Sequence, residues 1–115
     1  MESRHITLVN VRHLQRSDFD IYIGRWHPRF PNEPTYKWGN PYTLKDFTRQ
    51  QAIDKYEELV RSTPALMASL PELEDKRIGC WCVEKPISVI RPSQDRVCHG
   101  EPLIKLVAEL QERAQ

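Results

Sequence analysis

Three cysteines and one histidine near the C-terminus have the clearest potential for chemistry. Cys80 and Cys82 stand two positions apart, and Cys98 is followed directly by His99. Side chains two positions apart on a strand point to the same side, so Cys80 and Cys82 would aim both sulfurs at one place. Thiolates and an imidazole are ligands that tetrahedral zinc takes. The pattern predicts a zinc site at these four residues, with Gly100 allowing the turn that two adjacent ligands need.

The same residues support other interpretations. Free cysteines are often small core residues, in which case Cys80 and Cys82 would be inert and His99 would cap or pack. A helix that begins beside Cys98 would lower the pKa of its thiol and favour a redox or nucleophilic role. A His-x-Glu at a helix start is also found in zinc deaminases, although their cysteine pair is spaced differently. If the zinc kept an open position for water, Glu101 would be the candidate catalytic acid/base.

A second group of candidates lies in and beside the proline-rich segment 26–43. Aromatic side chains alternate there with cations, an arrangement that can stack a base and hold a phosphate. Arg25 and Lys37 are predicted to hold an anionic group, and Lys37 is also a candidate catalytic residue. Trp38 and Asn40 are predicted to shape or read the ligand, because the asparagine amide can match a donor–acceptor edge.

The competing interpretation of this segment is structural. Trp26 and Trp38 would fill the core beneath the loop, while Arg25 and Lys37 would be solvated. Loops longer than about 12 to 15 residues in a compact domain are usually functional or disordered. The aromatic content favours a packed loop. The Arg91–Arg96 stretch, by contrast, has the composition of a solvated loop.

Hydrophobic patterning predicts the elements that would position these groups. β-branched and apolar runs indicate strands over 6–11, 20–24 and 77–82. Apolar stripes indicate a helix from Thr43 to about 61, a short one over 64–70 and a last one over 101–113. The link between the first two strands leaves open whether they pair directly or are joined by a brief turn.

A strand–helix–strand crossover of this kind predicts a small α/β domain. We expect a partly parallel sheet of three to four strands with flanking helices, similar to a Rossmann fold. Ligands of such folds bind beyond the carboxyl ends of the strands. Gly24–Arg25 and Cys80–Cys82 both lie at such ends.

Length and composition limit the classes of protein. A chain of 115 residues predicts one domain, 1–115, and 39% apolar with 29% charged residues is typical of a globular protein. Seventeen basic and sixteen acidic residues give a formal charge of +1, so no global field attracts nucleic acid or anionic lipid. The absence of a long apolar run and of a secretion signal predicts a cytoplasmic protein without a membrane partner. Three cysteines, all in the last third, cannot staple a secreted scaffold.

Five separated motifs, taken together, resemble a known family. They are Ile21-Tyr-Ile-Gly-Arg25, Lys37-Trp-Gly-Asn-Pro41, a helix with Ala52 and Tyr56, Cys80-Trp-Cys82, and Cys98-His-Gly100. In this order they resemble the bacterial and phage domain of unknown function 4326, from about residue 8 to 110. The resemblance implies a stand-alone α/β domain, with signature positions at Arg25, Lys37, Asn40, Cys80, Cys82, Cys98 and His99. It implies no established reaction.

The leading hypothesis is a small enzyme or enzyme-like domain with a Cys/His zinc site. It would act on a nucleotide, nucleoside or modified base, as a hydrolase or transferase, in phage or nucleic-acid modification metabolism. The ligand class rests on analogy with nucleotide-handling folds. One alternative is a non-catalytic, zinc-stabilised module that binds protein or single-stranded nucleic acid. The other is a cofactor-free phage-type interaction or inhibitor protein.

Overall fold

The computed structural model describes residues 6–113, which contain one three-stranded sheet. Its strands β1 (Thr7–Asn10), β2 (Ile21–Tyr22) and β3 (Arg77–Cys80) are parallel and lie in the order β1-β3-β2. Because β3 lies between them, β1 and β2 do not pair, and a short 3-10 helix, Arg16–Asp18, interrupts their link. The predicted α/β class is confirmed, with a wholly parallel sheet.

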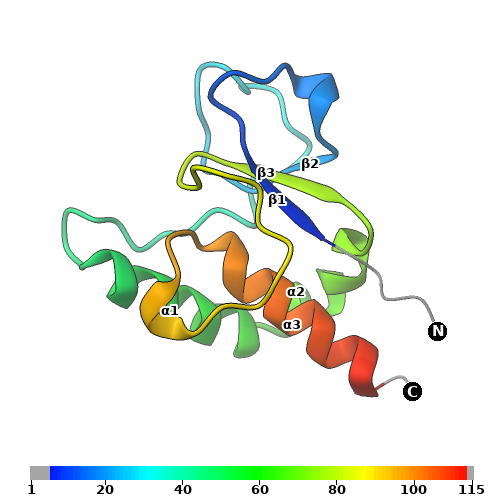
Figure 1. Cartoon of the computed structure of the whole chain (residues 1–115). Coiled ribbons are helices and arrows are strands. Elements are labelled where there is room, and N and C mark those ends of the chain that lie inside the picture. The colour runs from blue at the N-terminus through cyan, green and yellow to red at the C-terminus, as the bar shows by residue number, and fades with distance from the viewer. Residues whose placement is uncertain (1–5, 114–115) are drawn as a thin grey trace.

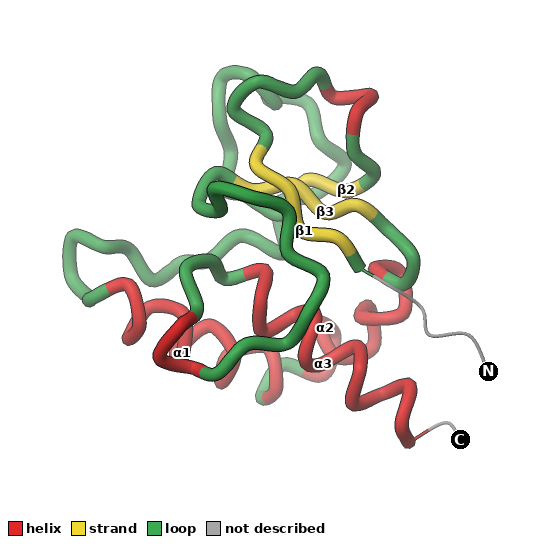
Figure 2. Tube along the Cα trace, in the orientation of Figure 1, coloured by secondary structure: helices red, strands yellow, loops and turns green. Residues whose placement is uncertain are grey.

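The helices lie together on one face of the sheet (Figure 1). They are α1 (Arg49–Arg61), α2 (Pro64–Ser69) and α3 (Gly100–Arg113), with 3-10 helices at Leu70–Leu73 and Ser93–Asp95. The other face is covered by loops, which Figure 2 shows in green above the strands. The chain passes through α1 and α2 between β2 and β3, so the parallel strands are joined by the predicted helical crossover.

Two apolar clusters follow from the alternation of side chains along the strands. Leu8 and Ile78 belong to the cluster between the sheet and the helices, whereas Val9 and Tyr22 belong to the cluster between the sheet and the loops. Gly79 makes room for the second cluster: a Cβ there would lie 2.4 Å from a methyl carbon of Val11. Both faces of the sheet are therefore packed, as parallel sheets require.

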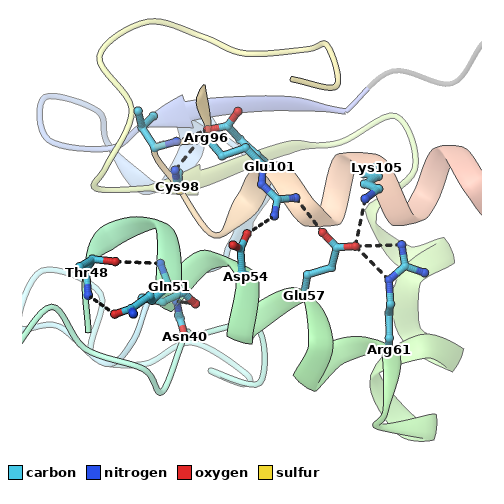
Figure 3. Close-up of polar contacts among 12 residues, drawn as sticks. Asn40, Thr48, Gln51, Asp54, Glu57, Arg61, Arg96, Cys98, Glu101 and Lys105 are labelled. Carbon is cyan, nitrogen blue, oxygen red and sulfur yellow. Dashed lines mark hydrogen bonds and ion pairs between the residues drawn. The ribbon is translucent and has the colours of Figure 1, made fainter. Parts of the chain in front are cut away.

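Helix α1 begins later than the sequence pattern predicted. The expected N-cap, Thr43, instead accepts backbone hydrogen bonds from Asp46 and Phe47 and so forms a turn. Thr48 is the true N-cap: its hydroxyl accepts from the Gln51 amide nitrogen at 3.1 Å, and the Gln51 side chain accepts from the Thr48 nitrogen at 3.0 Å (Figure 3). This reciprocal capping box stabilises a start at Arg49. The predicted end near Arg61 is confirmed.

Arg96 holds the segment before α3 against α1, so the predicted solvated loop is confirmed for the exposed residues 92–95 and wrong for Arg96. Its side chain is only 4% exposed and donates to Glu57 and Asp54, both at 2.7 Å (Figure 3). Arg61 and Lys105 also pair with Glu57. Burial alone would raise the pKa of Glu57, but the hydrogen bonds from Arg96, Arg61 and Lys105 outweigh it and lower the pKa to about 2.

Glu57→Gln is expected to reduce the acid sensitivity of the fold. Because the pKa of Glu57 is lower in the folded state than its ordinary value of 4.5, its stabilisation is present above about pH 4.5 and is lost toward about pH 2. The loss corresponds to roughly 2 to 3 kcal/mol in the free energy of unfolding. Urea denaturation across that range measures it. Glu58→Gln, an exposed site on the same helix, is the control. Equal acid dependence in wild type and Glu57→Gln would contradict the assignment.

Within residues 6–113, no helix is both long enough and apolar enough to cross a bilayer.

Candidate metal centre and adjoining pocket

The three sulfurs converge at the carboxyl end of β3. The Sγ atoms of Cys80, Cys82 and Cys98 all lie within 4.8 Å of one another, and those of Cys80 and Cys98 are 2.7 Å apart. Zn–S bonds of about 2.3 Å in a tetrahedron separate sulfurs by about 3.8 Å, so a modest opening of the closest pair fits a metal. Cys80 and Cys98 are buried, and Cys82 is exposed. The cluster could hold a metal ion.

Distant parts of the chain bring these cysteines together. Cys80 ends β3, and the turn after it is held by the Asn10 side chain, which donates to the Val83 carbonyl at 2.6 Å. Cys98 precedes α3, whose first residue, Gly100, packs closely against the sheet. A Cβ at Gly100 would lie 2.7 Å from a methyl carbon of Leu8. Gly100 has no positive φ, so it serves close packing and not the predicted turn.

His99 is oriented by the backbone of the neighbouring strand. Its Nε2 donates to the carbonyl oxygen of Ile23 at 2.7 Å, since a carbonyl can only accept. The other ring nitrogen, Nδ1, lies 3.8 Å from the Cys98 sulfur. The Tyr56 ring packs edge-on against the imidazole at 4.9 Å between centroids, and its hydroxyl donates to the Trp38 carbonyl at 2.7 Å. The structure therefore clusters the three predicted cysteine ligands and sets His99 Nδ1 beside Cys98; a metal role for His99 stays a prediction.

The sulfur cluster has a strongly uneven affinity for protons. Hydrogen bonds from Cys80 and Cys98, and then from His99, lower the pKa of the Cys82 thiol far below its ordinary value. Burial, followed by hydrogen bonds with the other two thiols, raises the pKa of Cys98. Cys82 is therefore the first of the three to carry the negative charge that a metal requires of a thiolate ligand.

Glu101 is held at the start of α3 by its neighbours. Its side chain is 1% exposed and pairs with Arg91 at 2.7 Å, while its oxygen Oε2 accepts from the amide nitrogens of Val97 and Cys98. Burial would raise the pKa of Glu101, but the hydrogen bond from Arg91 and those backbone donors lower it. A carboxylate at a helix N-terminus is favoured by the same backbone groups. These contacts fit a positioning residue, and the predicted acid/base role stays a prediction.

The four residues predicted to bind ligand from the aromatic loop make mostly structural contacts. Trp38 is 1% exposed, and its indole nitrogen donates to Glu72 at 2.8 Å. Asn40 donates to the Ala52 carbonyl and accepts from the Tyr42 nitrogen. Lys37 pairs with Glu72 at 3.0 Å, and Arg25 is exposed. A ligand role for Arg25, Lys37, Trp38 and Asn40 stays a prediction.

A pocket of about 730 Å³ adjoins the sulfur cluster and is lined by Cys82. Its other polar walls include Arg49 on α1 and, from the 84–91 loop, Lys85 and Arg91. Sequence analysis did not select these cations. Arg49 directly follows the helix cap, and nothing in the sequence around it indicates a pocket. For Lys85 and Arg91, the one signal was that the loop between the cysteine motifs contains both charged and apolar residues. Their convergence depends on how that loop folds against α1.

The fold and the cluster define a small parallel α/β domain with a candidate three-cysteine metal site. Comparison with known proteins shows that the chain belongs to the family described as Domain of unknown function (DUF4326), whose model matches residues 7–109. The resemblance seen in the five motifs is thereby confirmed.

One relative is the uncharacterized protein R718 of Acanthamoeba polyphaga mimivirus. It is 37% identical over 94 residues, which cover 76% of this chain and 65% of the mimivirus protein. The match thus spans just under two thirds of that relative's length. No solved structure gives a significant match.

Proposed function

We propose that this chain is a zinc-stabilised α/β domain that binds a nucleotide-like anionic small molecule. The zinc ligands are the three cysteine sulfurs and Nδ1 of His99. The observation that carries the proposal is the hydrogen bond from His99 Nε2 to the Ile23 carbonyl. It leaves Nδ1 on the side of the sulfur cluster, and an imidazole whose other nitrogen is bound in this way is typical of metal-ligating histidines.

Four protein ligands would make the zinc site a structural one, because a catalytic zinc keeps a position for water or substrate. Such a site holds the 83–97 segment and the start of α3 against the end of β3. Chemistry on a ligand would then take place beside the metal and not on it. A hydrolase or transferase reaction would therefore take place in the neighbouring pocket.

The nucleotide-like ligand class is supported by position. Cys80, Ile23 and Asn10 stand at or just beyond the carboxyl ends of three parallel strands. In open parallel sheets this is where ligands bind. The enzyme and the non-catalytic binding module predicted from the sequence share this zinc site. Metal content therefore distinguishes these two hypotheses from a cofactor-free interaction protein.

Metal analysis of the purified protein is the direct test. We expect one equivalent of zinc in the wild type, whose thiols become titratable only after chelation. We expect no zinc in Cys98→Ser. His99→Ala should weaken zinc binding by about tenfold or more, and the visible spectrum of the Co²⁺-substituted protein should change. Wild-type protein without zinc and with three freely titratable thiols would overturn the proposal. Unchanged affinity in His99→Ala would overturn the closed, four-ligand site.

A further inference from the structure

The pocket beside Cys82 has a size and lining suited to a small organic anion. Its volume of about 730 Å³ lies within the roughly 300 to 1,000 Å³ of small-molecule sites. The apolar part of its lining comes mainly from Ile87, Val89 and Val97, and the cationic part from Arg49, Lys85 and Arg91. Among residues 6–113, Glu84 is the one carboxylate in the lining.

A chain of hydrogen bonds orients the two arginines. Arg49 Nη1 donates to the Val97 carbonyl at 3.0 Å, and the Val97 nitrogen donates to Glu101 at 2.6 Å. Arg91 then binds both oxygens of the same carboxylate, at 2.7 and 2.9 Å. Because Glu101 is buried, it holds the Arg91 guanidinium directly and also holds the Val97 backbone, whose carbonyl Arg49 binds. Two guanidinium groups oriented by hydrogen bonds thus border the pocket.

Each arginine keeps donors that these contacts do not use. Among the contacts of residues 6–113, Arg49 makes no ion pair and donates only through Nη1, and Arg91 donates only through Nε and Nη2. Lys85 makes no hydrogen bond or ion pair within the same part of the chain. A guanidinium group with free N–H donors in a fixed orientation matches the oxygens of a phosphate.

We propose that this pocket binds the phosphate of a small organic phosphate. Arg49 and Arg91 bind the phosphate oxygens, Lys85 adds charge at the rim, and the organic part packs on Ile87 and Val89. The inference rests on the nucleotide-like ligand of the proposed function but assigns the anion to these residues instead of Arg25 and Lys37. Glu84, Glu101 and the sulfur cluster offset much of the positive charge. Hydrogen-bond geometry, more than net charge, therefore selects the ligand.

Calorimetric titration of the zinc-loaded protein tests the assignment. The probes are adenosine monophosphate, adenosine and inorganic phosphate. We expect the monophosphate to bind and adenosine to bind at least about tenfold more weakly. Arg49→Gln keeps a polar amide but loses the guanidinium N–H donors and the charge, and it should weaken monophosphate binding by about tenfold. Arg25→Gln, the same change at an exposed arginine outside the pocket, should leave binding unchanged.

Several results would overturn the inference. One is no binding of the monophosphate or of phosphate at millimolar concentration to protein that holds zinc. Another is that Arg25→Gln loses monophosphate binding while Arg49→Gln keeps it. If Arg49→Gln does not fold, Lys85→Ala decides instead, because Lys85 is exposed; it should weaken the monophosphate severalfold, and an unchanged affinity counts against the site. If the wild type is purified without zinc and with three freely titratable thiols, monophosphate binding that depends on Arg49 would support the pocket, although the zinc proposal would be overturned.

Discussion

Chelation of the metal from the zinc-loaded protein is expected to lower its melting temperature by roughly 10 to 20 °C. A ligand present at about 1,000 times its dissociation constant stabilises the folded state by about 4 kcal/mol. For a domain of this size, 1 kcal/mol shifts the melting temperature by about 4 °C. The large effect has a structural cause, because the cluster joins the end of β3 to the start of α3 and closes the segment between Cys82 and Cys98.

Thermal unfolding followed by circular dichroism, before and after chelation and after zinc is added back, measures this shift. Cys98→Ser is the matched control: it should melt near the chelated wild type and show no response to chelator or to zinc. A melting temperature of the wild type that chelation leaves unchanged, in protein shown to contain zinc, would contradict a stabilising role for the metal.

Trp38→Ala is expected to destabilise the domain by about 4 kcal/mol, within the range measured for buried aromatic residues truncated to alanine. Trp38 is 1% exposed, its indole donates to Glu72, and its carbonyl accepts from Tyr56. Truncation leaves a cavity beneath the loop and removes one donor to Glu72, which keeps its pairing with Lys37. Because Tyr56 packs against His99, the substitution should also loosen the support of the proposed metal ligand.

Chemical denaturation of Trp38→Ala and Trp26→Ala compares two tryptophans of the same loop. Trp26 is 59% exposed, so its truncation should change the free energy of unfolding by no more than about 0.5 kcal/mol. Equal effects of the two substitutions would contradict the structural assignment of Trp38. If Trp38→Ala stays as stable as the wild type but loses ligand binding, the original prediction of a ligand-shaping tryptophan is favoured instead.

The elements were largely predictable because they depend on local patterns. The β-branched run that includes Leu8 and the apolar stripe that includes Tyr56 are buried on the faces that their periodicity indicates. Errors occurred where two local signals compete: Thr43 and Thr48 are both acceptable caps, and only the Gln51 side chain, three residues after Thr48, decides between them.

The role of the aromatic loop could not be decided by the same means. Trp26 and Trp38 have the same residue type and similar neighbours in sequence, yet one is exposed and the other is in the core. Burial of Trp38 depends on Tyr56 and Glu72, which approach it from the helices. Residue type therefore identified candidates there without separating binding residues from packing residues.

The amino-acid sequence by itself determined which residue types could bind a metal, the spacing of Cys80 and Cys82, the α/β class and the family. Tertiary structure alone decided that β3 lies between β1 and β2, that His99 turns one nitrogen to Ile23, and that Arg49 and Arg91 border one pocket. The physical reason is that periodicity and capping act over a few residues. Contacts between residues far apart in the chain depend on how whole elements pack, which no local pattern encodes.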